Sequence, residues 1–313
     1  MDGHFAIEQP ARAWNDYFMN FNGTAGVWRR KCIEKAGGWQ ADTLTEDLDL
    51  SYRAQLEGWK LDYKIDLPCP SEIPTSVLAF KSQQFRWAKG SIQTAKKLLP
   101  NILRSQHCLK LKIEAIFHLT HYMIHPLLLA NFLIGCLILI NEIDLLWPQL
   151  EFLFVLILIA CAGPSYLYRF SQTILNKKLP LFFYPLMISL GCGLAVNNSR
   201  GVFEALLGKQ SPFVRTPKRG NRTKCYKVSI DLWFLIELTL GCFGLIILVH
   251  SPRTHFFLVP FIAMYTIGFL SIGLSSALES VFDSESQYKK CVSTVTSKGK
   301  VDSNAQSAYI SEI

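Results

Sequence analysis

Three acidic side chains, Glu46, Asp47 and Asp49, lie within four consecutive positions, and their types and spacing suit acid–base chemistry. Apolar residues recur after them at helical spacing, at Leu48, Tyr52 and Leu56. We therefore expect Asp47 in the first turn of a helix, where the helix dipole lowers the pKa of a carboxyl group. An ionised carboxylate held there could act as the general base for a hydroxyl nucleophile.

The limits of this helix are also marked in the sequence. Thr43, three residues before Glu46, matches the capping-box pattern, and Gly58 is a suitable end. A solvent-exposed helix with acids in its first turn would explain the same residues without any catalytic role. On a helix, Asp47 and Asp49 point about 200° apart, so we do not expect them to chelate one metal ion together.

A second group of chemically suitable residues follows at Gln83, Arg86 and Trp87. Their i, i+3, i+4 spacing places them on one face of a helix that we expect to begin near Pro74 or Thr75. The indole can stack on a sugar, and the guanidinium can form forked hydrogen bonds with a phosphate. An amphipathic helix lying on a membrane surface would place Trp and Arg in the same way.

Shorter elements are expected around these two groups. Residues 17–21 are a candidate buried strand, and a small-residue turn, Asn22–Gly26, leads into a helix from about Val27 to Ala36 that ends at Gly37. Such a turn can aim backbone N–H groups at a phosphate, although it is often only a tight connection. Alternating apolar residues between Leu61 and Leu67 predict a half-buried strand.

The remainder of the chain is much more apolar than residues 1–110. We expect four membrane spans, at Leu119–Ile140, Phe152–Tyr168, Leu232–Val249 and Phe256–Leu278. A fifth stretch, Leu179–Val196, is interrupted by prolines, and we place it in the membrane interface. This choice puts the basic residues between 200 and 227 on the same side as residues 1–110, as the positive-inside rule favours, with both ends of the chain in the cytoplasm.

The other polar and cysteine residues suggest few additional sites. Glu237 lies within an expected span, where it either faces a polar cavity or a partner or lies shallow enough to reach the lipid headgroups. His118, His121 and His125 share a helix face, but without an accompanying acid or cysteine we favour cavity-lining or interfacial histidines over a metal site. The nine scattered cysteines suggest free thiols. No recognisable nucleic-acid-binding module is present, and residues 283–313 have the composition of a disordered tail.

Several motifs in one order resemble those of the family 2 membrane glycosyltransferases, such as cellulose, mannan and hyaluronan synthases. Thr45-Glu46-Asp47 resembles the TED motif, and Gln83-x-x-Arg86-Trp87 resembles the QxxRW motif. The segment Phe213-Val214-Arg215-Thr216-Pro217-Lys218 looks like the gating loop FxVTxK, with Arg215 in place of valine. Asn22-Gly23-Thr24 matches the small-residue turn that precedes the acceptor-site helix.

The resemblance implies an α/β fold: the C-terminal, acceptor half of a cytoplasmic GT-A-type domain over residues 1–110, followed by an α-helical transmembrane bundle over 111–282. An interfacial helix near 179–207 and a gating loop at 211–220 would belong to the membrane region. Asp47, beside Glu46, would be the general base. The implied acceptor- and donor-binding residues are Gln83, Arg86, Trp87, Asn22, Gly23 and Thr24. The gating loop would act through Phe213, Arg215, Thr216 and Lys218, and Glu237 would line a polymer channel.

The implied reaction is inverting, processive transfer from a UDP- or GDP-linked sugar to a growing polysaccharide, coupled to translocation across an inner or plasma membrane. Such enzymes use Mg²⁺ or Mn²⁺, bound by a separate DxD motif in a nucleotide-binding half. We expect these ligands outside this chain, in an N-terminal half: the chain would be the product of a truncated gene, one subunit of a split enzyme or a sequence with a misplaced start, and it would be inactive without that half. Transfer of a single sugar to a lipid carrier and a non-catalytic membrane channel or scaffold subunit are the alternatives.

Overall fold

A computed structural model describes residues 2–23, 25–74, 76–140, 163–213, 232–250 and 258–297, with side chains described up to residue 281. All regular secondary structure in these ranges is helical. In addition to a helical stretch at 163–174, the elements are η1 (His4–Glu8), α1 (Gln9–Trp14), α2 (Arg30–Lys35), α3 (Glu46–Leu56), α4 (Val77–Arg104), α5 (Leu109–Thr120), η2 (His121–Met123), α6 (Ile124–Ile140), α8 (Phe183–Gly193), α9 (Ala195–Leu206), α10 (Phe234–His250) and α11 (Val259–Ser297).

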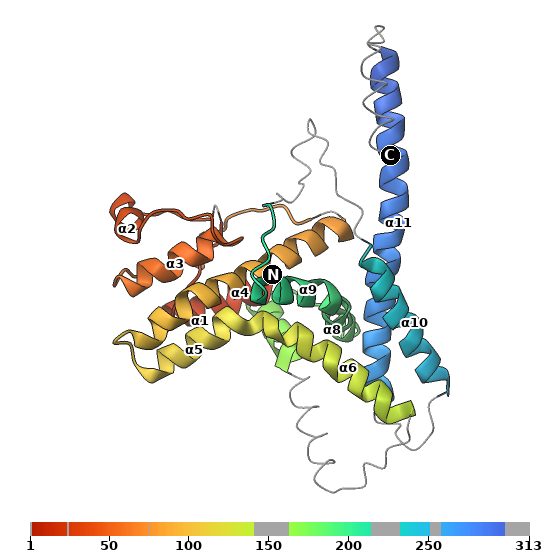
Figure 1. Ribbon diagram of the computed structural model, residues 1–313. Coiled ribbons are helices and arrows are strands. Elements are labelled where there is room, and N and C mark those ends of the chain that lie inside the picture. The colour runs from red at the N-terminus through yellow and green to blue at the C-terminus, as the bar shows by residue number, and fades with distance from the viewer. Residues whose placement is uncertain are drawn as a thin grey trace, which may run out of the picture.

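Helix α4 is the element to which most of the others attach. It contacts α3 and α5 on the N-terminal side of the molecule and α9 and α11 on the other (Figure 1). Its first turn is capped by the Ser76 hydroxyl, which accepts a hydrogen bond from the N–H of Ala79 at 3.1 Å. Because α4 is 28 residues long, it can connect the two parts of the molecule.

The two sides of α4 differ in chemistry. At about 100° per residue, Lys81, Lys89 and Lys96 fall within about 80° of one another around the helix axis. Measured from Lys81, Gln83, Gly90 and Thr94 fall at about 180–220°, on the opposite side, and Arg86 and Gln93 fall at about 120–140°, between the two. We call the first set the lysine face and the second the site face. The lysine face contacts α9, α10 and α11, and the site face contacts the start of α3.

The N-terminal part has a core between α3, α4 and α5. Phe18, Tyr52, Ile102 and Leu119 are buried there, and the Tyr52 hydroxyl lies 2.6 Å from Nδ1 of His118. Gly58, with φ 82°, follows the end of α3, and Gly37, with φ 83°, follows the end of α2. The two glycine helix ends predicted from the sequence are therefore confirmed.

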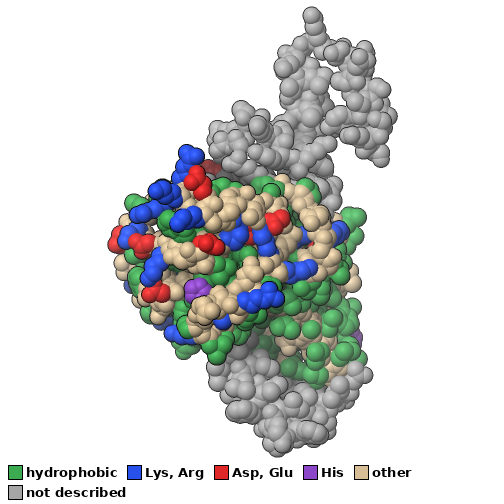
Figure 2. All heavy atoms as spheres, turned by 60° about the vertical axis from the view of Figure 1, so that its left-hand side comes forward, with side chains coloured by type: hydrophobic (Ala, Val, Ile, Leu, Met, Phe, Trp, Pro, Cys, Tyr) green, Lys and Arg blue, Asp and Glu red, His purple; other side chains and the backbone are tan. Residues whose placement is uncertain are grey.

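Helices α6, α8, α10 and α11 form a second, apolar cluster. Glycines allow these helices to approach closely: a Cβ at Gly268 of α11 would collide with the carbonyl oxygen of Ser189 in α8. Along the outer side of α6, apolar side chains are exposed at Ile124, Leu127, Leu133, Ile134, Leu137 and Ile140. Figure 2 shows charged side chains interspersed over the face that bears α2 and α3, with a hydrophobic area below them.

Within the described residues, Leu109–Ile140 and Val259–Val281 are long and apolar enough to cross a membrane, whereas α8 and α10 are apolar but shorter. These two stretches include most of two predicted spans. The predicted span Leu232–Val249 corresponds to α10, and most of Phe152–Tyr168 lies outside the described residues. Four-span topology and the interfacial placement of 179–207 stay predictions.

Three local expectations are not met. Residues 17–21 and 61–67 form no strand; instead, the N–H and the carbonyl of Met19 pair with the Gln55 side chain of α3. The α/β expectation is therefore not confirmed in the described ranges. Helix α3 starts after Thr45 without a side-chain cap, so the predicted capping box is absent. Helix α11 extends to Ser297, and the disordered tail over residues 283–313 stays a prediction.

Candidate functional site

The start of α3 is held against the site face of α4. The side-chain oxygen of Gln93 accepts a hydrogen bond from the N–H of Leu44 at 3.0 Å, and the hydroxyls of Thr45 and Thr94 lie 3.4 Å apart. Gly90 permits this approach, because a Cβ there would lie 2.6 Å from the Thr45 side chain and 2.9 Å from its backbone nitrogen. Helix packing therefore brings the Thr45-Glu46-Asp47 motif to the same side of α4 as Gln83 and Arg86.

Asp47 is half-buried at this position, and two backbone N–H groups bind its carboxylate. Oδ2 accepts a hydrogen bond from Gly23 at 3.0 Å, and Oδ1 accepts one from Leu48 at 2.8 Å. Gly23 has φ 59°, a left-handed conformation that favours glycine, so the turn at 22–23 can present its N–H to α3. The predicted small-residue turn and the predicted base are thus in direct contact.

The electrostatic environment of Asp47 differs from the one predicted. Burial has the largest effect and raises the pKa of Asp47 above 3.8, and the neighbouring Glu46 carboxylate also raises it. The Leu48 and Gly23 N–H groups and the Arg86 guanidinium lower it, but they do not offset burial. The expected net lowering of this pKa is therefore wrong, because burial by the surrounding protein outweighs the lowering by the N–H groups at the helix terminus.

Arg86 lies within electrostatic reach of both acids. Burial lowers its pKa, while Glu46 and Asp47 raise it. Its guanidinium carbon lies 4.6 Å from the ring centroid of Phe213, a cation–π contact that favours one orientation of the side chain. Among the described residues, the buried Nε of Arg86 and Oε1 of Gln83 have no hydrogen-bond partner. A donor and an acceptor are therefore left unsatisfied here, which is uncommon for buried polar groups.

The turn at Asn22 is held by a polar cluster from the N-terminal helices. Oδ1 of Asn22 lies 3.2 Å from Nε2 of His4 and accepts a hydrogen bond from the Asn20 side chain at 3.0 Å. Gln9, which is fully buried, donates to the side chain of Asn20 at 2.8 Å. Helices η1 and α1 therefore position the turn whose Gly23 N–H binds Asp47.

Five residues that the sequence predicted as candidates lie close together in the structure: Gly23, Glu46, Asp47, Arg86 and Phe213. Trp87 is half-buried on the adjoining part of α4. Thr24 and the gating-loop residues Arg215, Thr216 and Lys218 lie outside the described residues. Glu237 is fully buried and forms an ion pair with Lys81 at 2.8 Å, so it has a protein partner; a role in lining a channel stays a prediction.

The donor groups in the described residues do not fit a metal site. No group of three His, Cys, Asp or Glu side chains suited to a metal ion is present there. Asp49 is fully buried and pairs with Arg53 at 2.6 Å, pointing into the protein and away from Asp47. The Mg²⁺ or Mn²⁺ ion implied by the resemblance therefore has no ligand set among these residues.

The sequence did not indicate several residues that shape the site. Ser51 accepts a hydrogen bond from the N–H of Phe21 at 2.8 Å, and Gln55 binds both backbone polar groups of Met19, so α3 holds the segment before the turn. Gly90 could have been noticed as a glycine inside a helix directly after Trp87. Gln55 and Gln93 carry no local signal, because their partners are 36 and 49 residues away.

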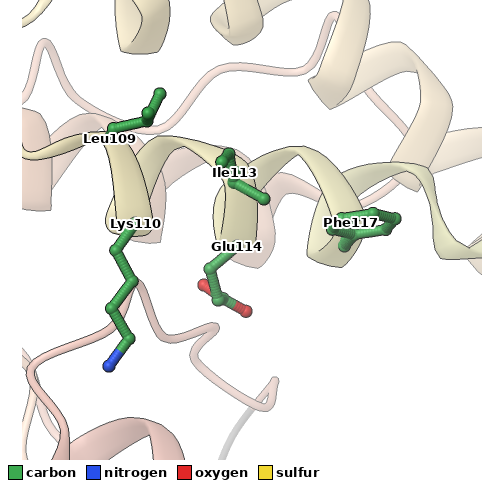
Figure 3. A pocket seen from close by; sticks show the side chains of 5 residues that line it. All are labelled: Leu109, Lys110, Ile113, Glu114 and Phe117. Atoms are coloured by element: carbon green, nitrogen blue, oxygen red, sulfur yellow. The ribbon is translucent and has the colours of Figure 1, made fainter.

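A shallow hollow on the surface of α5 is a separate feature. Leu109, Lys110, Ile113, Glu114 and Phe117 line it along one side of the helix (Figure 3). Leu109 and Phe117 are exposed there. None of these residues belongs to α3 or α4, so the hollow is not part of the candidate site.

Comparison with known proteins identifies the family of this chain. The sequence model of the family described as "Glycosyl transferase family group 2" matches residues 11–171, which is just over half of the chain and includes α3 and α4. The chain belongs to this family.

Plant proteins are among its relatives. The chain is 43% identical over 106 residues to "Glucomannan 4-beta-mannosyltransferase 2" of Arabidopsis thaliana, a match that covers 34% of this chain and 20% of that protein. It is 46% identical over 102 residues to "Probable glucomannan 4-beta-mannosyltransferase 7" of Oryza sativa subsp. japonica, covering 33% and 17%. The chain thus spans about a fifth of the length of the curated relatives that it matches.

Proposed function

We propose that the protein provides the acceptor side of an inverting glycosyltransferase site that extends a β-linked polysaccharide. The names of its relatives suggest mannose as the sugar and a glucomannan as the polymer. The donor would then be a GDP- or UDP-linked mannose. The observation on which the proposal rests is that Asp47, held by the Gly23 N–H, lies within electrostatic reach of Arg86, whose buried Nε has no hydrogen-bond partner among the described residues.

Asp47 would act as the general base. An acceptor hydroxyl attacks the anomeric carbon, its proton passes to the Asp47 carboxylate, and the nucleoside diphosphate leaves with the electron pair of the broken bond. Each Asp47 oxygen accepts one backbone hydrogen bond and so retains a lone pair for the incoming proton. The raised pKa supports this role, because a stronger base accepts a proton more readily near neutral pH.

The site face of α4 would bind the sugar chain and the leaving group. Trp87 offers an indole for stacking on the terminal sugar of the acceptor, as apolar sugar faces favour aromatic rings. Arg86 offers a guanidinium N–H to the diphosphate or to a sugar oxygen, and Gln83 offers a side-chain oxygen. Phe213 under the guanidinium favours one orientation of Arg86, and the gating-loop residues that follow it would cover the nucleotide.

The donor and its metal ion need partners beyond the described residues. A divalent cation would supply charge neutralisation for the departing diphosphate. The described residues contain no ligand set for it, and we propose that the metal and the nucleotide bind to a nucleotide-binding portion that lies beyond these residues. We also propose a multi-pass membrane protein, with the site, the gating loop and both termini cytoplasmic, in which two or more apolar helices form the exit path for the polymer.

The proposal is tested by substituting Asp47 in the full chain. Each variant is reconstituted in membranes together with the nucleotide-binding portion. We expect Asp47→Asn to reduce transfer of radiolabelled mannose from GDP-mannose to a manno-oligosaccharide by at least about a thousandfold, because the base is lost while the shape is kept. Glu57→Gln removes an exposed carboxylate from the other end of α3 and is the matched control; it should keep wild-type transfer.

Acceptor binding is measured in the same samples by titration with a manno-oligosaccharide. Asp47→Asn should bind the oligosaccharide as wild type does, whereas Trp87→Ala should not. Transfer retained by Asp47→Asn would contradict the role of this residue. Acceptor binding without any transfer by the wild type would favour a non-catalytic subunit, and a product extended by one sugar on a lipid would favour the lipid-carrier alternative.

A further inference from the structure

The lysine face of α4 is joined to α10 and α11 by a buried ion pair. The ammonium of Lys81 lies 2.8 Å from Oε2 of Glu237 in α10 and donates to the hydroxyl of Ser276 in α11 at 3.4 Å. Only 3% of Lys81 and none of Glu237 is exposed. A buried charge is costly unless it is paired, so this contact strongly favours one position of Lys81 relative to the two apolar helices.

The first turn of α4 is joined to α11 by a second acid. The carboxylate of Glu279 accepts hydrogen bonds from the backbone N–H groups of Val77 at 2.7 Å and Leu78 at 2.9 Å. These N–H groups have no partner inside the helix, and a negative charge at the N-terminus of a helix is favourable. Glu279 therefore fixes the end of α4, while Glu237 fixes a point one turn further along.

Both acids belong to one closely packed unit. Helices α10 and α11 run antiparallel, since Gly241 of α10 faces Leu270 and Gly273 of α11 faces Leu238. This register places Glu237, in the first turn of α10, level with Ser276, and Glu279 follows about one turn later in α11. Any shift or rotation of the pair would move both anchoring carboxylates together.

The anchored residues and the site residues lie on the same few turns of one rigid helix. Lys81 is two residues from Gln83 and five from Arg86, and neither of these side chains shares the face of Lys81 on α4. A rotation of α4 about its axis that moves the Lys81 ammonium away from Glu237 must also turn Gln83 and Arg86 relative to Asp47. The anchors on the lysine face therefore control the geometry of the site face.

We propose that Glu237 and Glu279 are positioning residues, which set the depth and rotation of α4 and thereby the distance of Arg86 and Trp87 from Asp47. This inference rests on the proposed function, because it assigns the site face to acceptor binding. In this role the two acids, on α10 and α11, hold the side of α4 that faces away from the acceptor site. They do not contact the sugar chain.

The test compares four variants of the full chain in membranes with the nucleotide-binding partner. Glu237→Gln leaves Lys81 without its carboxylate, and Lys81→Glu combined with Glu237→Lys restores a pair with reversed charges. Lys81→Arg keeps the charge. Glu114→Gln is the matched control, because it breaks the partly buried pair between Arg12 and Glu114 (2.5 Å), away from the lysine face.

Two readouts are needed. Hydrogen exchange of the peptide spanning residues 77–90 reports the anchoring of α4 without requiring any activity. We expect Glu237→Gln to speed this exchange and to raise KM for the oligosaccharide acceptor roughly tenfold, with KM for the nucleotide sugar unchanged. The reversed pair should recover most of both losses, Lys81→Arg should resemble wild type, and Glu114→Gln should change neither readout.

The opposite pattern would overturn the proposal. If Glu237→Gln leaves exchange in residues 77–90 unchanged and shortens the polymer, and the reversed pair does not recover it, then Glu237 acts on the polymer and not on α4. Failure of the proposed function is distinguished by Asp47→Asn: if that variant retains transfer while the exchange pattern is as expected, the anchoring stands and the assignment of the site does not.

Discussion

The two faces of α4 are built from opposite kinds of contact. On the site face, Gly90 and Gln93 bring the start of α3 close through backbone proximity and neutral hydrogen bonds. On the lysine face, Lys81 and Lys89 are buried in ion pairs with acids of other helices. The comparison indicates that buried charge pairs attach α4 to the apolar helices, whereas neutral hydrogen bonds and close backbone contact attach it to α3.

The largest effect on stability should come from the lysine face. Lys89 is fully buried and lies 2.7 Å from Glu204 in α9, which also contacts Arg200. Although burial alone would raise the pKa of Glu204, hydrogen bonds from Lys89 and Arg200 lower it, so the pair favours the charged carboxylate. Glu204→Gln leaves the Lys89 ammonium without that charge, and we expect it to lower the free energy of unfolding by about 3–5 kcal/mol.

An exposed ion pair provides the control for this measurement. Arg30 and Glu34 lie 2.7 Å apart in α2 with 91% and 56% of their side chains exposed. Glu34→Gln should change the free energy of unfolding in detergent by less than about 1 kcal/mol. If both variants lose the same stability in denaturant titrations, the buried pair of Lys89 and Glu204 stabilises the fold no more than an exposed pair does, and the prediction is wrong.

A smaller effect is expected on the site face at Gly90. Alanine would place its Cβ 2.9 Å from the backbone nitrogen of Thr45, so the start of α3 must move. We expect Gly90→Ala to cost about 1–2 kcal/mol, since the strain exceeds the gain in helix propensity. Transfer activity should fall more than the folded fraction, because the displaced residues include Glu46 and Asp47.

Gly191→Ala is the matched substitution. Gly191 also lies inside a helix, α8, but a Cβ there would meet no atom within 4 Å. Its unfolding free energy should stay the same or rise by up to about 1 kcal/mol. Equal losses at Gly90 and Gly191 would mean that the close contact between α4 and Thr45 does not exist in solution.

The sequence predicted the local elements of the site better than their environment. The helix that carries Asp47, its end at Gly58 and the common face of Gln83 and Arg86 follow from residue spacing, which depends only on helix geometry. The direction of the Asp47 pKa shift could not be predicted, because burial by distant parts of the chain outweighs the helix terminus.

Long-range partners were outside what residue spacing can predict. Glu237 was expected to face a cavity or a partner, but nothing near it in the sequence points to Lys81, 156 residues away. The segment 17–21 has the apolar composition of a strand, yet its backbone groups bind Ser51 and Gln55 side chains of α3. The tertiary structure decides which polar group pairs with a given backbone N–H, so local composition cannot predict that partner.

The most direct test of Asp47 as the general base is the pH dependence of kcat/KM for wild type and Glu46→Gln. Activity requires the unprotonated carboxylate, so it should fall as pH decreases through the Asp47 pKa, which burial places above the ordinary value of 3.8. Since Glu46 raises that pKa further, Glu46→Gln should move the acid limb to lower pH. An acid limb that stays in place, or moves to higher pH, would contradict the assignment of Asp47 as the base.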